Sequence, residues 1–154
     1  MKEIIKYPNE TLRTVSDPVK LPLNKEDQDL LTEMYSYVKE HKDEAVGLSA
    51  IQVGVPKRMC AIRYSTDTKT ISYKLVNPKI IKRSRETLLL TEGCLSIPEE
   101  HNELVPRYKS ITVIGYDAIT NKNVVINADG FLARVLQHEI DHMDGILFID
   151  RIKN

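Results

Sequence analysis

Apolar residues recur at intervals of three and four positions between residues 24 and 42. This spacing places them on one face of an α-helix, which repeats about every 3.6 residues. Asn24 can cap the first turn with its side chain, and the acidic residues Glu26 and Asp27 also favour a helix N-terminus. We therefore expect a helix beginning at Asn24 and ending near residue 42. Its core-facing stripe consists of Leu30, Leu31, Met34, Tyr37 and Val38.

Short runs of β-branched residues, separated by turn residues, replace this pattern between residues 57 and 128. Runs of this length predict strands, and their close succession favours mainly antiparallel sheets. The segment 117–122 contains Asp and Asn residues that favour a hairpin turn between the last two runs. The predicted strands cover residues 58–62, 71–76, 78–82, 87–90, 111–116 and 124–126.

A second helical pattern follows the predicted strands. Asp129 is expected to cap this helix, and Gly145 is expected to mark its end. Its apolar stripe continues through Val135 to His138 and His142, which predicts that both imidazoles face the interior. Together the patterns predict an α+β fold, in which small antiparallel sheets pack around a central helix that carries the two histidines.

The length and charge of the chain narrow the classes of protein to which it can belong. It has 154 residues with no internal repeat and no flexible linker, so we expect one domain over residues 1–154. The formal net charge is +0, which gives no signal for nucleic-acid or lipid binding. No apolar run is long enough for a signal peptide or a membrane span, and a cytoplasmic location is expected.

The two cysteines have different surroundings. Cys60 lies in a predicted strand, where cysteine usually behaves as a small buried hydrophobe. Cys94 follows Gly93 and precedes Pro98, which is typical of a turn or a strand end. A reducing compartment would keep both cysteines as thiols. Because Cys94 lies at a turn, its thiol is available to bind a partner.

Residues 138–142 read H-E-x-x-H, the pattern with the clearest chemical meaning in the chain. Histidines four positions apart lie about 40° apart around a helix, so His138 and His142 can reach one metal ion. Glu139 between them can then act on a metal-activated water. The alternative is a solvated helix end with two unrelated histidines. Two histidines also leave a catalytic metal short of its usual three protein ligands.

Three stretches resemble the bacterial-type peptide deformylases, in the order in which that family has them. Residues 47–54, GLSAIQVG, are similar to the family's G-Φ-G-Φ-A-A-x-Q stretch, where Φ is apolar. Residues 92–96 read E-G-C-L-S, and residues 137–142 match Q-H-E-x-D-H. The resemblance extends over nearly the whole chain, since flanking segments such as Asn77-Pro78 also agree.

The resemblance implies that Cys94 is the third metal ligand beside His138 and His142. One thiolate and two neutral imidazoles suit ferrous iron or zinc and leave a fourth position for water. The family implies one divalent metal ion, with Fe²⁺ as the biological metal and Zn²⁺, Ni²⁺ or Co²⁺ able to replace it.

The implied reaction is the removal of the formyl group from N-formyl-methionyl nascent peptides, with release of formate. A water activated at the metal would attack the formyl carbonyl, and Glu139 would move the proton from the water to the leaving nitrogen. The resemblance implies two donors to the formyl oxygen, the side-chain amide of Gln52 and the backbone N–H of Leu95. Nascent chains as substrate imply the ribosome as a transient neighbour.

The methionine side chain of such a substrate is expected to occupy an apolar pocket, since an unbranched thioether fills such pockets adaptably. By the resemblance, the peptide backbone pairs like a strand with the stretch around Val46 and Gly47, and Arg107 also holds it. The residues expected to line the pocket are Val46, Leu90, Phe131 and Val135.

The chain departs from the family pattern in its first motif, where Ala45 replaces a glycine and Ser49 replaces an alanine. A serine hydroxyl in a packed site needs a hydrogen-bond partner. Ile51 also stands where the family often has proline or a polar residue. An alternative hypothesis is therefore a deformylase-like protein with another substrate or with a binding role alone. The hypothesis of a generic zinc metalloprotease has less support, because the Cys94 motif has no role in such an enzyme.

Overall fold

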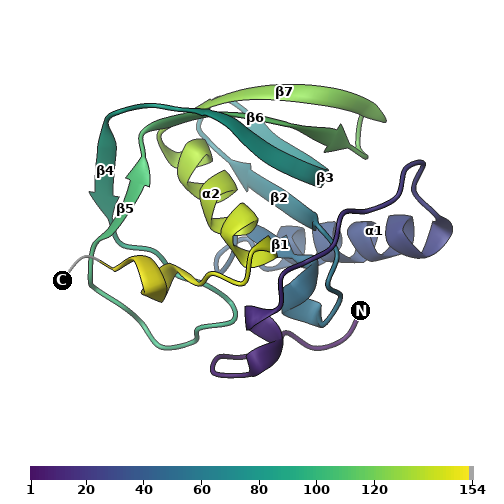
Figure 1. The fold of residues 1–154 in the computed structure, drawn as a ribbon, viewed down its shortest axis with the longest axis horizontal. Helices are drawn as coiled ribbons and strands as arrows, with labels where there is room; N and C mark the ends of the chain where they lie inside the picture. Colours follow the sequence, from purple (N-terminus) through teal and green to yellow (C-terminus); the bar gives the residue numbers. More distant parts are fainter. Residues whose placement is uncertain (153–154) are drawn as a thin grey trace.

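The computed structural model describes residues 1–152, which form two α-helices, seven strands and three short 3₁₀ helices (Figure 1). The α-helices are α1 (Lys25–Glu40) and α2 (Phe131–Met143). The 3₁₀ helices span Glu10–Arg13, Ala50–Val53 and Phe148–Arg151. The strands are β1 (Gly47–Ser49), β2 (Met59–Ser65), β3 (Thr70–Arg83), β4 (Thr87–Leu90), β5 (Val105–Tyr108), β6 (Ser110–Asp117) and β7 (Lys122–Asp129).

All strand pairs are antiparallel. Five strands form one sheet in the order β1-β2-β3-β6-β7, and β4 and β5 form a second, two-stranded sheet. Figure 1 shows α2 enclosed between the larger sheet and the β4-β5 pair. The predicted α+β class, with antiparallel sheets around a central helix, is confirmed.

The apolar side chains of β2 explain how the two helices attach to one sheet. Cys60 and Ile62 pack with α2, whereas Met59 and Ala61 pack with α1. Alternate residues of a strand point to opposite faces, so a strand covered on both faces needs consecutive apolar residues. The sheet therefore separates α1 from α2 and holds α2 by a buried face.

The helix predictions hold except at one cap. The Asn24 side chain accepts a hydrogen bond from the Asp27 N–H at 2.8 Å, as expected for the start of α1. The predicted cap of α2 at Asp129 is wrong. Asp129 ends β7, where its carboxylate accepts a hydrogen bond from the Ser110 hydroxyl at 2.6 Å, and Gly130 with φ 62° turns the chain into the helix. Gly145, with φ 73°, follows the end of α2 as predicted.

The strand predictions are right in position and incomplete in number. The two runs predicted at 71–76 and 78–82 belong to the single strand β3, which continues through a register shift after Val76 and the left-handed residue Asn77. The hairpin at 117–122 is confirmed between β6 and β7. Strands β1 and β5 were not predicted, because β1 has only three residues and β5 contains Pro106.

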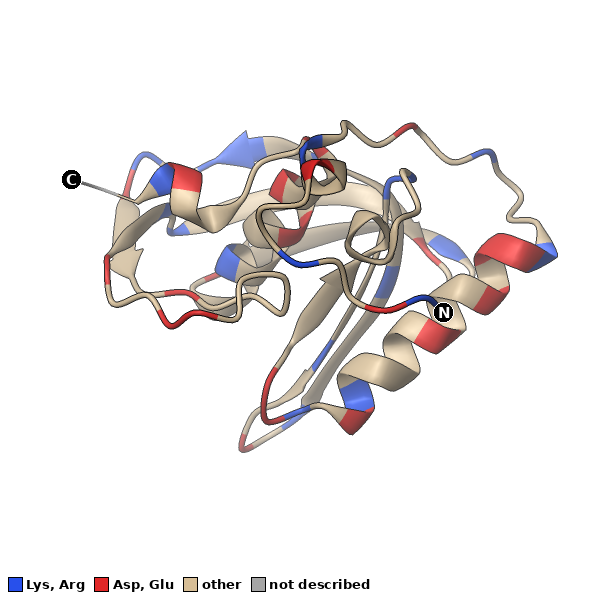
Figure 2. Ribbon diagram, turned by 90° about the horizontal axis from the view of Figure 1, so that it is seen from below, with Lys and Arg blue, Asp and Glu red and all other residues tan. Residues whose placement is uncertain are grey.

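Charged residues of both signs are distributed along the chain. Figure 2 shows Lys and Arg residues interspersed with Asp and Glu residues along the ribbon, in agreement with the net charge of +0. Within residues 1–152, none of the helices combines the length and the apolar character that a membrane crossing requires.

Candidate metal centre and active site

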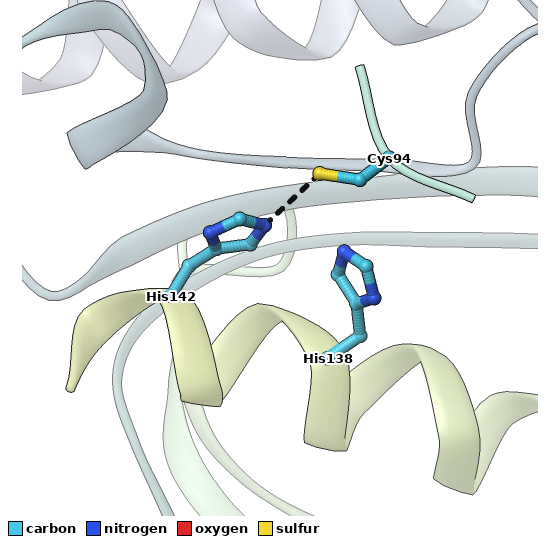
Figure 3. A group of neighbouring side chains, drawn as sticks. All are labelled: Cys94, His138 and His142. Carbon is cyan, nitrogen blue, oxygen red and sulfur yellow. Dashed lines mark hydrogen bonds between the residues drawn. The ribbon is translucent and has the colours of Figure 1, made fainter. Parts of the chain in front are cut away.

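Cys94, His138 and His142 come together beside α2 (Figure 3). One ligand atom from each residue can be chosen so that all three atoms lie within 4.8 Å of one another. The Cys94 sulfur lies 3.4 Å from His142 Nε2. The two histidines come from successive turns of α2, and Cys94 comes from the segment between β4 and β5. The structure thus brings together the three residues that the sequence motifs predicted as ligands.

The backbone around Cys94 is fixed from two sides. The Ile97 N–H donates to the Cys94 carbonyl at 3.0 Å and closes a tight turn. The N-terminal segment holds the same turn, since the Tyr7 N–H donates to the Ser96 carbonyl and Lys6 Nζ donates to the Leu95 carbonyl, both at 2.8 Å. The cysteine sulfur is therefore presented to α2 by an ordered turn.

The donor set fits a metal ion by its chemistry. His138 Nδ1 lies 2.9 Å from a carboxylate oxygen of Glu92, so the other ring nitrogen is left for a ligand. Burial, with the nearby His138, lowers the pKa of His142 well below its ordinary value, which favours the neutral imidazole that metals bind. One thiol and two imidazoles suit zinc or ferrous iron with an open fourth position.

Hydrogen bonding around His138 has the opposite effect on its charge. Burial alone would lower the pKa of His138, but its interactions with Cys94 and Glu92 raise it well above its ordinary value. The metal-free protein therefore favours a positive charge between the Cys94 sulfur and the Glu92 carboxylate. A metal cation would compete with that proton for the same donors.

Glu92 is the centre of a buried ion network behind the candidate ligands. Its carboxylate accepts hydrogen bonds from Arg107 Nε at 2.8 Å, Arg107 Nη2 at 2.9 Å and Arg134 Nη1 at 2.6 Å, besides its contact with His138. Burial opposes ionisation, but these partners hold the pKa of Glu92 well below its usual value. Glu92 is thus an anion that orients the His138 ring. The sequence interpretation had not assigned it a role.

Arg107 lies in the same network and is not exposed in the cavity beside Cys94. Its Nη1 donates to Asp141 at 2.6 Å, and its remaining donors face Glu92. Asp141 in turn accepts from Arg151 Nε at 2.6 Å, which connects α2 with the 3₁₀ helix that follows it. The guanidinium expected to hold a peptide is therefore engaged by two buried carboxylates.

Glu139 is buried beside the three candidate ligands. Its side chain packs against Gly47 so closely that a Cβ added at Gly47 would lie 2.6 Å from Oε2. Burial raises the pKa of Glu139, and the nearby His138 together with a hydrogen bond from Ser49 partly offsets this rise. A raised pKa suits a group that must accept and release a proton near neutral pH. Ser49 thereby has the hydrogen-bond partner that its sequence position required.

Gln52 and Leu95 both lie next to Cys94, Gln52 by contact with its sulfur and Leu95 as the following residue. Gln52 Oε1 accepts from the Ser49 N–H at 2.9 Å, which turns the amide nitrogen toward Ser96 Oγ at 3.0 Å and the Cys94 sulfur at 3.6 Å. The hydrogen bonds formed among residues 1–152 leave the Leu95 N–H without an acceptor. The Gln52 amide nitrogen therefore faces the sulfur, and the Leu95 N–H follows Cys94 directly in the chain.

A cavity of about 320 Å³ opens beside these groups. Val46, Phe131 and Val135 line it together with Gly47, as expected from the sequence. Leu90 is not among the lining residues, and its side chain on β4 is 50% exposed. A larger hollow of about 590 Å³ lies elsewhere, between α2 and residues of β3, β4 and β5, and includes none of the candidate ligands.

A buried carboxylate beside a thiol and two imidazoles, with amide donors and a partly apolar cavity, is the arrangement of a metal-assisted hydrolase site. Comparison with known proteins narrows this class. The family model for polypeptide deformylase matches residues 1–154. Peptide deformylase 2 of Geobacillus stearothermophilus is 41% identical over 165 residues, covering 99% of this chain and 89% of the relative.

Solved structures agree with the sequence comparison. A peptide deformylase from Legionella pneumophila matches with a TM-score of 0.87 at 35% identity, covering 99% of this chain and 86% of that one. The Met-Ala-Ser-bound class I type b peptide deformylase from Acinetobacter baumannii matches with a TM-score of 0.85 at 30% identity, covering 99% and 98%. The chain belongs to the polypeptide deformylase family, whose members are enzymes acting on N-formyl peptides.

Proposed function

We propose that this protein is a metal-dependent deformylase that removes the formyl group from N-formyl-methionyl peptides. The observation that carries the proposal is the convergence of Cys94, His138 and His142 beside Glu139, where Cys94, His138 and Glu139 line a partly apolar cavity. These three residues would hold one divalent ion. When bound, the ion supplies a Lewis acid that lowers the pKa of a water molecule toward neutrality.

The other groups of the site would carry the remaining steps. The Glu139 carboxylate accepts a proton from the attacking water and delivers it to the nitrogen of the methionine as the C–N bond breaks. Formate and a free amine are the products. Proton transfer by a positioned group of this kind contributes roughly 10²- to 10⁴-fold to the rate. The Gln52 amide and the Leu95 N–H would donate to the formyl oxygen as negative charge develops on it.

The form of the cavity supports a peptide with an apolar first side chain. Val46, Phe131 and Val135 supply apolar walls of the kind that an unbranched thioether fills. Strand β1 lies at the edge of the five-stranded sheet, so one side of Gly47 is open to pairing with an extended peptide. The Acinetobacter baumannii neighbour, which was solved with Met-Ala-Ser bound, supports the same substrate class.

The metal and the cellular setting follow from the same proposal. The family resemblance favours Fe²⁺ as the resident ion, with Zn²⁺, Ni²⁺ and Co²⁺ as possible replacements, and a thiol with two imidazoles is compatible with each. A substrate at the start of a nascent chain would place the enzyme in the cytoplasm and transiently near the ribosome. We propose no direct contact with nucleic acid, since the net charge of +0 gives no basis for one.

Formate release from formyl-Met-Ala-Ser tests the proposal. The protein would be purified without oxygen and loaded with Fe²⁺, and metal content would be measured on the same sample. We expect turnover by the wild type and a loss of about 10²-fold or more in kcat for Glu139→Ala, with the metal retained. A fully loaded wild-type protein that releases no formate would contradict the proposed function and favour a binding role.

A further inference from the structure

Ser49 contacts both of the side chains to which the proposed function assigns chemistry on the substrate and the water. It is the last residue of β1 and is completely buried. Its backbone N–H donates to Gln52 Oε1 at 2.9 Å. Its hydroxyl donates to Glu139 Oε1 at 2.9 Å and lies 3.1 Å from the Glu139 backbone carbonyl. One residue therefore connects the amide donor to the proton carrier.

The two oxygens of the Glu139 carboxylate have different surroundings. Oε1 is bound by the Ser49 hydroxyl, which is the only side chain among residues 1–152 that hydrogen bonds with this carboxylate. Oε2 faces the Cα of Gly47, where an added Cβ would approach it to 2.6 Å. Gly47 also lines the cavity. The carboxylate is therefore held at Oε1 by a hydrogen bond, and at Oε2 it faces a glycine whose lack of a side chain leaves room for it.

Rotation about the last side-chain torsion of a glutamate is broad, so a free carboxylate exchanges its two oxygens easily. A hydrogen bond to one oxygen removes that freedom and fixes which oxygen faces the reacting groups. Positioning of this kind is valuable because a misplacement of about 1 Å can reduce a rate by about 10²-fold.

We propose that Ser49 is a positioning residue, whose hydroxyl holds Oε1 of Glu139 so that Oε2 carries the proton. The inference rests on the proposed function, since it concerns the same carboxylate. Ser49 itself does not line the cavity, so its hydroxyl acts on the reaction only through Glu139. Replacing it by alanine would remove the hydroxyl and keep the backbone N–H that orients Gln52.

Steady-state kinetics of Ser49→Ala with formyl-Met-Ala-Ser form the first arm of the test. We expect kcat to fall about 10- to 100-fold while KM stays within about twofold, because the substrate loses no contact. In a Glu139→Ala background the same change should have no further effect on the residual rate. Equal slowing in both backgrounds, or wild-type kinetics for Ser49→Ala, would overturn the proposal.

Ser16→Ala is the matched control. Ser16 is also a buried serine, and its hydroxyl has no partner among the described residues and lies outside the site. The deletion therefore removes the same atom without touching Glu139. We expect its kcat and KM to stay within about twofold of the wild type. A fall in kcat equal to that of Ser49→Ala would show a general effect of removing buried hydroxyls and would overturn the proposal.

A second arm needs no activity and no metal. Denaturant unfolding of the metal-free wild type, Ser49→Ala, Glu139→Ala and the double variant gives the coupling between the two side chains. Ser49→Ala changes the unfolding equilibrium constant by some factor in the wild type and by another in the Glu139→Ala background. We expect these two factors to differ at least about fivefold. Additive effects would overturn the contact. Absence of formate release by the wild type would reject the proposed function instead, and the coupling alone would then decide whether Ser49 holds Glu139.

Discussion

At the scale of single residues, Cys94 distinguishes the proposed metal site from a simple histidine pair. Its sulfur lies 3.4 Å from His142 Nε2, so the thiol and the imidazole could hold the same ion. Cys94→Ala is expected to weaken metal binding by more than about 100-fold, which exceeds the usual cost of losing a group behind a ligand. Metal content after dialysis against a chelator measures this.

Cys60→Ala is the control for the cysteine substitution. Cys60 is buried on β2, packs in the apolar cluster beside α2 and is not one of the candidate ligands. The control should keep one equivalent of metal. If Cys94→Ala kept the same equivalent as the control, the assignment of a Cys-His-His site would be wrong.

Glu92 is expected to support both the fold and the metal site. Its buried carboxylate balances Arg107 and Arg134 and orients His138. Glu92→Gln keeps the size of the side chain and removes the charge, leaving two buried guanidinium groups poorly compensated. We expect the free energy of unfolding of the metal-free protein to fall by about 3 kcal/mol, and metal affinity to fall about 10- to 100-fold.

Denaturant unfolding and metal titration of this variant measure the two effects separately. Glu86→Gln is a suitable control, because Glu86 forms an exposed ion pair with Lys109 at 3.5 Å. An exposed ion pair contributes little to the free energy of unfolding. The control should therefore differ from the wild type in this free energy by less than about 1 kcal/mol. Equal effects of the two substitutions would contradict the role assigned to Glu92.

The residues that the sequence did not reveal share a physical feature. The motif histidines were predictable because two ligands on one helix turn have a fixed spacing. Glu92 and Ser49 act through contacts with residues 46 and 90 positions away in the chain. No local pattern encodes such a contact, although Ser49 was recognisable as a hydroxyl that needed a partner. The sequence also led us to expect that Arg107 binds the peptide. Its buried carboxylate partners, Glu92 and Asp141, are distant in sequence, so no local pattern indicates them.

At the scale of elements, the end of α2 depends on a close approach between two segments. Gly145 has φ 73°, and a Cβ added there would lie 2.4 Å from the Arg13 carbonyl oxygen. Gly145→Ala combines an unfavourable backbone conformation with a backbone clash. We expect the free energy of unfolding to fall by roughly 2–4 kcal/mol, as measured by denaturant unfolding.

Gly93→Ala provides the comparison, because a Cβ added at Gly93 would meet nothing within 4 Å and φ is not positive there. Its stability should stay within about 0.5 kcal/mol of the wild type. A Gly145→Ala protein as stable as Gly93→Ala would show that the connection between α2 and the N-terminal segment adapts freely.

The elements that were predictable are those with a strong local signal. Helix α1 has a complete apolar stripe and an Asn24 cap, and both its existence and its start agree with the structure. Strand β1 is defined instead by pairing Gly47 with Ile62 and Ser49 with Cys60 on β2, which is a tertiary property. Asp129 was expected to cap α2 because aspartate favours helix N-caps. In the structure it belongs to β7 instead, where it pairs with Ser110 of β6 and its carboxylate accepts a hydrogen bond from the Ser110 hydroxyl.

At the scale of the whole molecule, an ion pair connects the first 3₁₀ helix, Glu10–Arg13, with the last one, Phe148–Arg151. Arg13 Nη2 donates to Asp150 Oδ1 at 3.0 Å. The hydrogen bond with Arg13 lowers the pKa of Asp150 below the ordinary value of an aspartate. Because the folded pKa is the lower one, the stabilisation is present above about pH 3.8 and is lost as pH falls through the folded pKa.

Asp150→Asn should therefore lower Tm at neutral pH, and its difference from the wild type should shrink as the pH falls below about 4. Thermal unfolding followed at several pH values measures this difference. Asp67→Asn, on the exposed turn between β2 and β3, is the control and should keep the wild-type Tm at neutral pH. A difference for Asp150→Asn that grew toward acid pH would have the wrong sign for a lowered pKa.

The expectation of a single domain over residues 1–154 leads to a prediction about cooperativity. Cys60 and Ile62 belong to the apolar cluster around α2, whereas Met59 and Ala61 belong to the cluster around α1. All four residues lie on β2, so neither cluster can open without disturbing the strand that they share. We therefore expect one unfolding transition with coincident midpoints for far-ultraviolet circular dichroism and tyrosine fluorescence. The seven tyrosines are suitable probes because the chain has no tryptophan. Separate midpoints for the two signals in the metal-free protein would mean that the two layers unfold independently.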